Sequence, residues 1–345
     1  MSVQLPYIPY FRRTARDAEY YECFLQPRLP AEIFDVHMHL NLPEHVSAVD
    51  EQRLISDWAL ECGHVLSCDD AYAVAAELFP GCAYRIAGFP WPIREADLRA
   101  NNEYLAQMKR DGRLEPFMAL RPEWDLEEVE RTLLQGGFVG FKPYPDIVSG
   151  VKGADIGIFD FLPKPQWRIA DKHKKAVMLH LPRKQRLADP DNITELLEAR
   201  ERFPDTEIIV AHLGRAFCPY FLEKGLSLLG SAVKGFRFDI SGVTNPEVLD
   251  MAFERIDPRN ILFGSDMPIF LWHGTRRWTE RTYLNISREK FHWNTVRPEP
   301  EEAEEFTLFL YEQLRHTLDS MDRHGLGDPE KAGVFGGNAQ GVLKL

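Results

Sequence analysis

The apolar residues of the chain fall into short, almost continuous runs, and stretches with helical spacing of apolar positions lie between these runs. A run without polar alternation is typical of a strand buried on both faces of a parallel sheet. We predict helices at residues 96–112 and 193–203, the second with Asp191 and Asn192 as N-cap candidates. The predicted strands cover residues 32–40, 84–89, 114–120, 137–142, 176–181, 207–213, 236–240 and 260–265.

This alternation of strands and helices predicts an α/β fold, a closed (β/α)₈ TIM barrel. An open, Rossmann-like sheet is the alternative, but that fold needs a glycine-rich turn after its first strand. The residues after Leu40 read NLPEH and contain no glycine. The closed barrel is therefore the predicted fold.

The barrel accounts for residues 32–345, and two segments stand out from its regular pattern. Residues 1–31 have weak periodicity, and we expect an N-terminal arm that packs on the barrel or on a neighbouring subunit. Residues 267–299, after the last strand, form a long aromatic segment that we interpret as a lid or a subunit contact. A helix near 299–323 is predicted to follow. The tryptophans of the aromatic segment are Trp272, Trp278 and Trp293.

The charge balance narrows the range of partners. The chain has a formal net charge of −12, which opposes binding to nucleic acids and to anionic membranes. A small anionic molecule stays compatible with this charge, because a local cluster of Arg and Lys can oppose the global field. The five cysteines are scattered and the N-terminal residues lack the apolar core of a signal peptide, so we expect reduced thiols and a cytoplasmic location. A homo-oligomer remains an open alternative.

Candidate chemistry begins on the first predicted strand. Asp35, His37 and His39 occupy alternate positions, so their side chains share one face of the strand. Two imidazoles placed in this way can bind one cation, which then requires further ligands from elsewhere in the chain.

Further donors occur at the ends of other predicted strands. His180, His212 and Asp266 follow the fifth, sixth and eighth apolar runs, and the C-terminal strand ends of a barrel meet at one active-site face. A single histidine in an apolar strand is usually a core residue. Burying several polar residues at matching strand ends costs free energy unless each has a partner or binds a metal ion. The joint pattern therefore favours a metal site. Of the remaining histidines, His45 and His273 lie nearest to the predicted site.

Together these motifs resemble the amidohydrolase superfamily. The shared features are D-x-H-x-H on the first strand, the histidines after strands five and six, and G-S-D-x-P at residues 264–268. The chain is most similar to the amidohydrolase-related branch that includes aminocarboxymuconate semialdehyde decarboxylase, resorcylate decarboxylases, and lactone or pyrone hydrolases. The segment FGGNA at residues 335–339 resembles the end of that branch, and the match extends from about Ile33 to the C-terminus.

The resemblance implies one divalent metal ion, with zinc expected and manganese as the alternative. His37, His39 and His180 would be ligands, and Asp266 would be a further ligand or a proton acceptor. His212 would act as a general base or would polarise the substrate. Asp35 would accept a hydrogen bond from a ligand histidine or would anchor the strand end.

Three cations follow predicted strand ends and suggest an anion pocket. Arg121, Lys142 and Arg215 come after strands three, four and six, and Arg is suited to bidentate contacts with a carboxylate. In binuclear superfamily members a carboxylated lysine at the position of Lys142 bridges two metals. The narrower branch usually holds one metal, so we favour a substrate-binding or structural role for Lys142. The alternative for each cation is an ordinary salt bridge.

These features predict a metal-dependent hydrolase that acts on a small carboxylated lactone, ester or amide through metal-activated water. His212 and Asp266 would transfer protons. A non-oxidative decarboxylase of an unsaturated or aromatic acid would use the same residues and is the main alternative. A non-catalytic metal-binding barrel is a second alternative. A deaminase is disfavoured, because Leu181 and Pro182, rather than a glutamate, follow His180.

Overall fold

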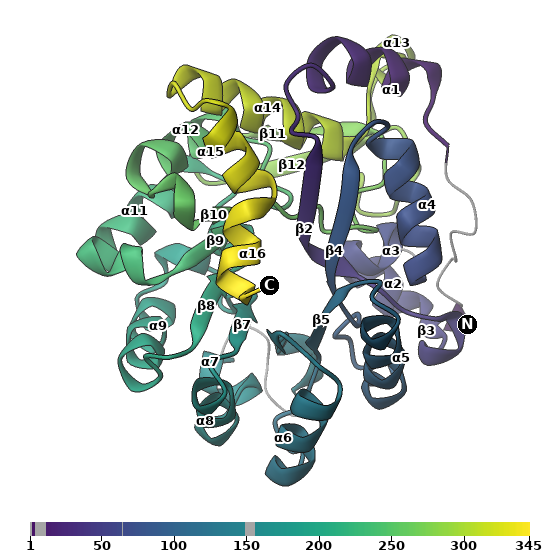
Figure 1. Cartoon of the computed structure of the whole chain (residues 1–345). Coiled ribbons are helices and arrows are strands. Elements are labelled where there is room, and N and C mark those ends of the chain that lie inside the picture. Colours follow the sequence, from purple (N-terminus) through teal and green to yellow (C-terminus); the bar gives the residue numbers. More distant parts are fainter. Residues whose placement is uncertain (1, 4–11, 64, 149–155) are drawn as a thin grey trace.

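A sheet of eight parallel strands, surrounded by helices, forms the centre of the structure, a computed structural model that describes residues 2–3, 12–63, 65–148 and 156–345 (Figure 1). The strands are β2 (Glu32–His39), β4 (Ala83–Phe89), β5 (Glu115–Met118), β6 (Gly140–Phe141), β7 (Ala176–Leu179), β8 (Glu207–Val210), β9 (Arg237–Asp239) and β10 (Ile261–Leu262). They pair in the order β10, β9, β8, β7, β6, β5, β4, β2. Each of the eight predicted strands overlaps one of them.

The sheet closes between its first and last strands. The Val36 N–H donates to the Phe263 carbonyl over 3.1 Å, and the Asp266 N–H donates to the His37 carbonyl over 2.8 Å. Met38 and Met267 form a parallel bridge one step further along. The predicted closed (β/α)₈ barrel is therefore confirmed.

The interior of the barrel is packed with apolar side chains below the level of the predicted site. Because each buried side chain of this size stabilises the fold by roughly 1.5–3 kcal/mol, the strands need apolar residues on this face. The helix α16 (Asn338–Leu343) lies across one end of the barrel, where Ala339 joins this cluster (Figure 1). The strand residues of the cluster include Phe34, Val36, Phe89, Phe117, Met178, Ile209 and Leu262.

Helices occupy the connections between strands. The predicted helix at 96–112 corresponds to α5 (Leu98–Arg110), and that at 193–203 to α9 (Pro190–Arg202). Asp189, rather than Asp191 or Asn192, is the N-cap of α9, because Pro190 occupies its first turn and starts the helix earlier. The helices of the connections are α4 (Cys68–Leu78), α5 (Leu98–Arg110), α6 (Leu126–Gln135), α7 (Ile158–Phe161), α8 (Lys164–Lys172), α9 (Pro190–Arg202), α10 (His212–Arg215), α11 (Pro219–Leu229) and α12 (Pro246–Arg255).

The remaining elements lie outside this regular alternation. They are β1 (Ser2–Val3), α1 (Ala15–Tyr20), β3 (Val49–Asp50), α2 (Glu51–Ser56), α3 (Trp58–Cys62), β11 (Gly274–Trp278), β12 (Tyr283–Ser287), α13 (Pro300–Glu305), α14 (Phe309–Arg323) and α15 (Asp328–Ala332). The helix predicted near 299–323 is thus divided into α13 and α14.

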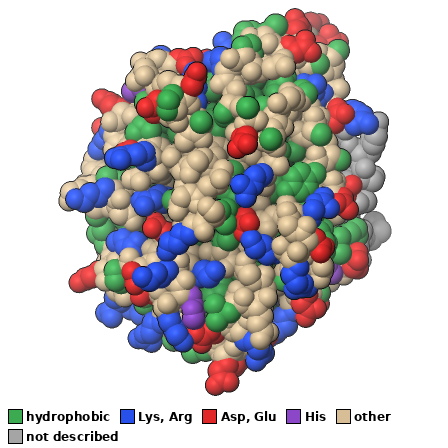
Figure 2. Space-filling view, viewed as in Figure 1, with side chains coloured by type: hydrophobic (Ala, Val, Ile, Leu, Met, Phe, Trp, Pro, Cys, Tyr) green, Lys and Arg blue, Asp and Glu red, His purple; other side chains and the backbone are tan. Residues whose placement is uncertain are grey.

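No described helix combines the length and apolar character needed to span a lipid bilayer. On the face seen in Figure 2, basic and acidic side chains are interspersed, so neither sign covers that face alone.

The described part of the N-terminal segment packs on the barrel's own helix α14. The rings of Tyr20 and Tyr21 lie 6.4 and 5.8 Å from the ring of Tyr311. Arg28 forms ion pairs with Asp319 and Asp322 over 2.7 and 2.8 Å. Residues 4–11 of the predicted arm lie outside the described residues.

The aromatic segment 267–299 contains an antiparallel hairpin formed by β11 and β12. Trp272 is buried and its ring lies 4.5 Å from that of Phe309, while Trp293 packs 5.5 Å from Trp272. Trp278 is half-buried at the end of β11. The segment is therefore attached to α14 by stacked aromatic rings.

A charged triad of buried Asp17, buried His273 and half-buried Glu289 connects the hairpin segment to the N-terminal helix. The two ring nitrogens of His273 lie 3.0 Å from a carboxylate oxygen of Asp17 and 2.8 Å from one of Glu289. Burial alone would lower the pKa of His273. The two carboxylates raise this pKa by more than burial lowers it, so the net shift is upward. Burial raises the pKa of Asp17, but its hydrogen bond with His273 helps to bring the net value below the usual range. The triad is most favourable when His273 is protonated and both acids are ionised.

We expect His273→Gln to lower the free energy of unfolding by about 1–3 kcal/mol, because Asp17 loses a charged partner but keeps other donors. A raised histidine pKa stabilises the fold fully below about pH 6.5, and this contribution disappears as pH rises through the folded value. The lowered carboxylate pKa values contribute above about pH 4, and that contribution disappears at lower pH. Urea unfolding of both proteins should therefore differ most between about pH 4.5 and 6.5. A difference that grows above pH 8 would contradict this assignment.

Candidate active site

Three potential metal ligands meet at the C-terminal end of the barrel. The Nε2 atom of His39 lies 3.0 Å from Oδ1 of Asp266, and the Nε2 atom of His37 lies 3.3 Å from the same oxygen. All three side chains are buried. Their ligand atoms lie within 4.8 Å of one another, so His37, His39 and Asp266 can hold one ion. We call these residues the metal triad.

His37 is oriented by Asp239, a residue that the sequence interpretation missed. Its Nδ1 atom lies 3.0 Å from Oδ2 of Asp239, which ends β9 and is fully buried. Asp239 also accepts the His212 N–H over 3.1 Å. The available signal was an acidic residue at the end of the predicted buried strand FRFDI, because a carboxylate is rarely buried without a partner.

The chemistry of this donor set fits a divalent cation. Asp239 can only accept when ionised, so it holds the Nδ1 proton of His37, and Nε2 is the nitrogen left for a metal ion. That nitrogen faces the carboxylate of Asp266 over 3.3 Å. A cation between these two groups would bind both, and imidazole nitrogen with carboxylate oxygen is a donor set found at zinc and manganese sites.

Asp35 anchors the strand end and does not contact a ligand imidazole. Its carboxylate accepts the backbone N–H groups of His37 and Ser265, each over 3.0 Å. It also accepts the hydroxyls of Tyr84, over 2.6 Å, and of Ser265. Of the two roles considered for Asp35, the structure therefore shows the anchor, which joins β2 to the chain just after β10.

His212 lies next to the metal triad on a left-handed turn. The φ angles of residues 212–215 are 56°, 50°, 68° and 64°, although only Gly214 favours this region. Non-glycine residues in this conformation are strained, and such strain often occurs at functional sites. The turn places both His212 and Arg215 at the same pocket.

The ring of His212 is neutral and is held by backbone. Its Nδ1 atom lies 3.0 Å from the Ser241 carbonyl and 2.8 Å from the Ser241 hydroxyl, which itself donates to Asp239. Because the carbonyl can only accept, Nδ1 carries the proton and Nε2 is an acceptor. Burial lowers the pKa of His212 to about 4, with Asp266 opposing the shift. The ring lies 4.7 Å from that of His37.

His180, the remaining predicted ligand, follows β7 and stands apart from the metal triad. Its ring lies 5.3 Å from the ring of His212 and 4.7 Å from that of Tyr144. Burial and Arg215 lower the pKa of His180 well below its ordinary value, so the ring is neutral. It lines the same pocket as the triad but is not part of its cluster of ligand atoms.

The three predicted cations have different surroundings. Lys142 is fully buried, with its Nζ atom 3.3 Å from Nε2 of His37, and burial lowers its pKa to about 8. Arg215 lines the pocket and donates to the Leu181 carbonyl over 3.0 Å. Arg121 instead donates to the carbonyls of Ile147 and Arg94, over 3.3 and 3.4 Å. The structure thus brings Lys142 and Arg215 to the pocket, and Arg121 braces the neighbouring loops.

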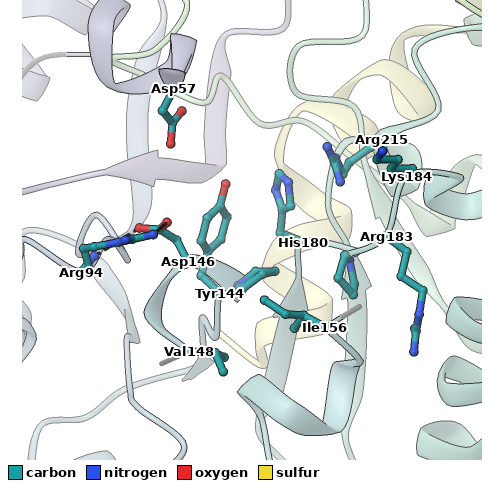
Figure 3. Close-up of a pocket in the computed structure, with 12 residues that line it drawn as sticks. Asp57, Arg94, Tyr144, Asp146, Val148, Ile156, His180, Arg183, Lys184 and Arg215 are labelled. Atoms are coloured by element: carbon teal, nitrogen blue, oxygen red, sulfur yellow. Dashed lines mark hydrogen bonds and ion pairs between the residues drawn. The ribbon is translucent and has the colours of Figure 1, made fainter. Parts of the chain in front are cut away.

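Two adjoining cavities open onto these residues. The inner pocket has a volume of about 190 Å³ and contains the metal triad, Lys142 and His212. The outer pocket has a volume of about 420 Å³ and is shown in Figure 3. Four residues line both, namely Asp57, Tyr144, His180 and Arg215. The aromatic residues that line the inner pocket are Trp58, Trp91, Tyr144, Phe217, Phe270 and Tyr283.

The other two histidines considered, His45 and His273, do not line these cavities. His45 lies 2.7 Å from the Asn101 side-chain oxygen, and His273 belongs to the triad with Asp17 and Glu289. Both have structural contacts that account for their positions.

The barrel and its metal triad agree with the sequence relationship of the chain. Residues 34–345 match the sequence profile of the amidohydrolase family, and the chain belongs to this family. No curated protein sequence matches the chain.

Solved structures with the same fold include enzymes of two kinds. A dihydroxybenzoic acid decarboxylase from Polaromonas, with bound manganese and 2-nitroresorcinol, is 17% identical, with a TM-score of 0.54 and coverage of 92% of this chain and 97% of that one. A 5-carboxyvanillate decarboxylase from Novosphingobium aromaticivorans, also with manganese, is 14% identical, with a TM-score of 0.55 and coverage of 93% and 97%. A probable 2-pyrone-4,6-dicarboxylic acid hydrolase from Acinetobacter baumannii, with bound citric acid, is 14% identical, with a TM-score of 0.55 and coverage of 91% and 99%. At these identities the likeness establishes the fold.

We expect Asp239→Asn to lower the affinity for Mn²⁺ or Zn²⁺ about 10–100-fold, because the ligand His37 loses its charged acceptor. Competition with a chelator measures this affinity without any substrate. Ser241→Ala is the control, since it changes the same cluster but leaves the Asp239 carboxylate in place. Equal affinities for Asp239→Asn and the parent protein would contradict the role of Asp239.

Proposed function

We propose that this protein is a metal-dependent, non-oxidative decarboxylase of a small aromatic or unsaturated acid. The observation that carries the proposal is the inner pocket, a cavity of about 190 Å³ walled by aromatic rings above the metal triad. Flat aromatic walls favour a planar ring through offset and edge-to-face contacts. The small volume favours a single ring over a larger ligand.

The charges around the inner pocket suit an acid. Lys142 places its ammonium beside His37, and Arg215 lines the same cavity. A carboxylate near these cations would be attracted by charge-assisted hydrogen bonds. The solved decarboxylases with this fold were described with manganese and aromatic ligands, which supports the proposal by analogy of fold.

The proposed reaction places one proton on the ring carbon that carries the carboxylate. The bond between this carbon and the carboxylate breaks, its electron pair stays on the ring, and CO₂ leaves. A divalent cation held by His37, His39 and Asp266, with His180 as a proposed further donor, would supply Lewis-acid stabilisation of negative charge on oxygen. The proton comes from solvent, and His212, with its acceptor Nε2, and Asp266 are the residues proposed to take it up and pass it to the ring carbon.

A second candidate is hydrolysis of a carboxylated lactone, ester or amide. The observation that favours it is the neutral His212 ring, whose Nδ1 proton is directed to the Ser241 carbonyl and whose Nε2 is left as an acceptor. Such a ring can remove a proton from water at neutral pH. The solved structure described as a probable pyrone hydrolase has the same fold.

One metal ion per chain is proposed, with zinc or manganese as its identity. A carboxylated Lys142 would instead bridge two ions. Elemental analysis of the purified full chain gives the ratio directly, and a value near two would exclude the single-ion site. A barrel that binds metal but turns over none of the acids or esters described below would support the non-catalytic alternative.

A panel of hydroxylated benzoates and carboxylated lactones separates the two reactions. With the manganese-loaded protein we expect CO₂ release and loss of the ring carboxylate, measured by ¹³C-labelled substrate. Incubation in deuterium oxide should place deuterium on the carbon that carried the carboxylate. Hydrolysis of a lactone without CO₂ would reject the decarboxylase and support the second candidate.

His212→Asn should lower kcat about 10²–10⁴-fold while the protein retains its metal, because proton transfer is typically worth that factor. His37→Ala should lose the metal and the activity together. Metal content measured on the same samples distinguishes these outcomes. Loss of metal from the His212→Asn protein would show that His212 is a ligand.

A further inference from the structure

The outer pocket extends the cavity above the metal triad away from the reacting centre. It is larger than the inner pocket, with a volume of about 420 Å³ against about 190 Å³. Figure 3 shows Tyr144 and His180 pointing into the space between Asp57 and Arg215, where the two pockets meet. A molecule with its reacting group in the inner pocket could therefore continue into the outer one.

Two of the cations at the outer pocket are already neutralised. Arg94 lies 2.9 Å from an oxygen of Asp146, and Arg183 lies 3.1 Å from an oxygen of Glu195. In Figure 3 the Arg183 side chain also points away from the centre of the cavity. These two arginines stabilise the walls and have little charge left for a ligand.

The remaining two cations have no acidic partner among the described residues. Arg215 donates one hydrogen bond to the Leu181 carbonyl, and Lys184 forms neither a hydrogen bond nor an ion pair in the described part of the chain. Both lie on the same side of the outer pocket in Figure 3. Arg186 donates to the Arg215 carbonyl over 3.3 Å and lies over the rings of Phe217, Phe221 and Tyr283, so it adds a further positive charge that has no acidic partner among the described residues. An unpaired, largely buried guanidinium is unfavourable unless a ligand anion compensates for it.

An acid occupies the opposite side of the junction. Asp57 caps α3 by accepting the Ala59 N–H over 3.2 Å, and it shares Arg53 with Glu95 and Asp146. Asp146 also pairs with Arg94, so three carboxylates face two arginines and leave one net negative charge on that side. An anion in the outer pocket would therefore be attracted toward Arg215 and Lys184 and repelled by Asp57.

We propose that Arg215 and Lys184 form a second anion subsite, and that the natural substrate carries a second acidic group, distant from the group that reacts. The assignment of the reacting group of this substrate rests on the proposed function. The subsite itself is a binding property, which can be measured without turnover. Its ligand class is a planar dicarboxylate or an equivalent dianion.

Benzoate, phthalate, isophthalate and terephthalate are suitable probes, because they share one ring and differ in the number and spacing of carboxylates. We expect at least one dicarboxylate to bind the manganese-loaded full chain tenfold or more tightly than benzoate, as measured by calorimetry. This preference should weaken as the salt concentration rises. If none of the three dicarboxylates binds more tightly than benzoate, the proposal is overturned.

Variants of opposite sign test the assignment to residues. Lys184→Ala should reduce the preference for the dicarboxylate about tenfold. Asp57→Asn should increase it several-fold, and asparagine preserves the N-cap. Lys344→Ala, which removes the same charge from the C-cap of α16, is the matched control and should leave the preference unchanged. Equal effects of Lys184→Ala and Lys344→Ala would reject the subsite.

Failure of this proposal is distinguishable from failure of the proposed function. A dicarboxylate preference that depends on Lys184, without CO₂ release from any acid, would reject the reaction and retain the subsite. CO₂ release from a monocarboxylate, without any dicarboxylate preference, would retain the reaction and reject the subsite.

Discussion

The contact between β2 and the chain after β10 is the constraint on which the site depends. His39 and Asp266 are 227 residues apart in sequence, and they meet only because the barrel closes at this point. Asp35 secures the closure, since its carboxylate accepts two backbone N–H groups and two hydroxyls from both sides of the joint. A fully buried carboxylate is unfavourable alone, and these four donors make its burial tolerable. The relative positions of the three residues of the metal triad are therefore set by this contact between β2 and the residues after β10.

Much of the fold was predictable, because its signals are local. Uninterrupted apolar runs identified the strands, and the alternating positions of His37 and His39 placed both side chains on one face. Asp266 could be placed with them because strand ends of a barrel share one face. The supporting residue Asp239 was missed, because it was read as part of an apolar run. The N-cap of α9 was misplaced, because Pro190 starts the helix earlier than its apolar pattern suggests.

The parts of the site that lie on loops could not be predicted in the same way. Arg121 follows a strand as Lys142 does, yet its guanidinium bonds to loop carbonyls, and only the folded loops decide this. The left-handed turn that places His212 and Arg215 is built largely from residues that disfavour it. Aromatic segment 267–299 gave no clear hairpin signal, although β11 and β12 pair along their whole length. Each of these features follows from tertiary packing, which outweighs local preference.

The separation of the ligands along the chain also affects the order of folding. His37 and His39 are synthesised early, whereas Asp266 follows most of the barrel. Contacts between distant segments form late, since closing a long loop costs chain entropy before any contact compensates for it. A chain that is not yet complete therefore has His37 and His39 but lacks Asp266, and we expect its affinity for a metal ion to be low. We therefore expect the complete metal triad to form only when the barrel closes.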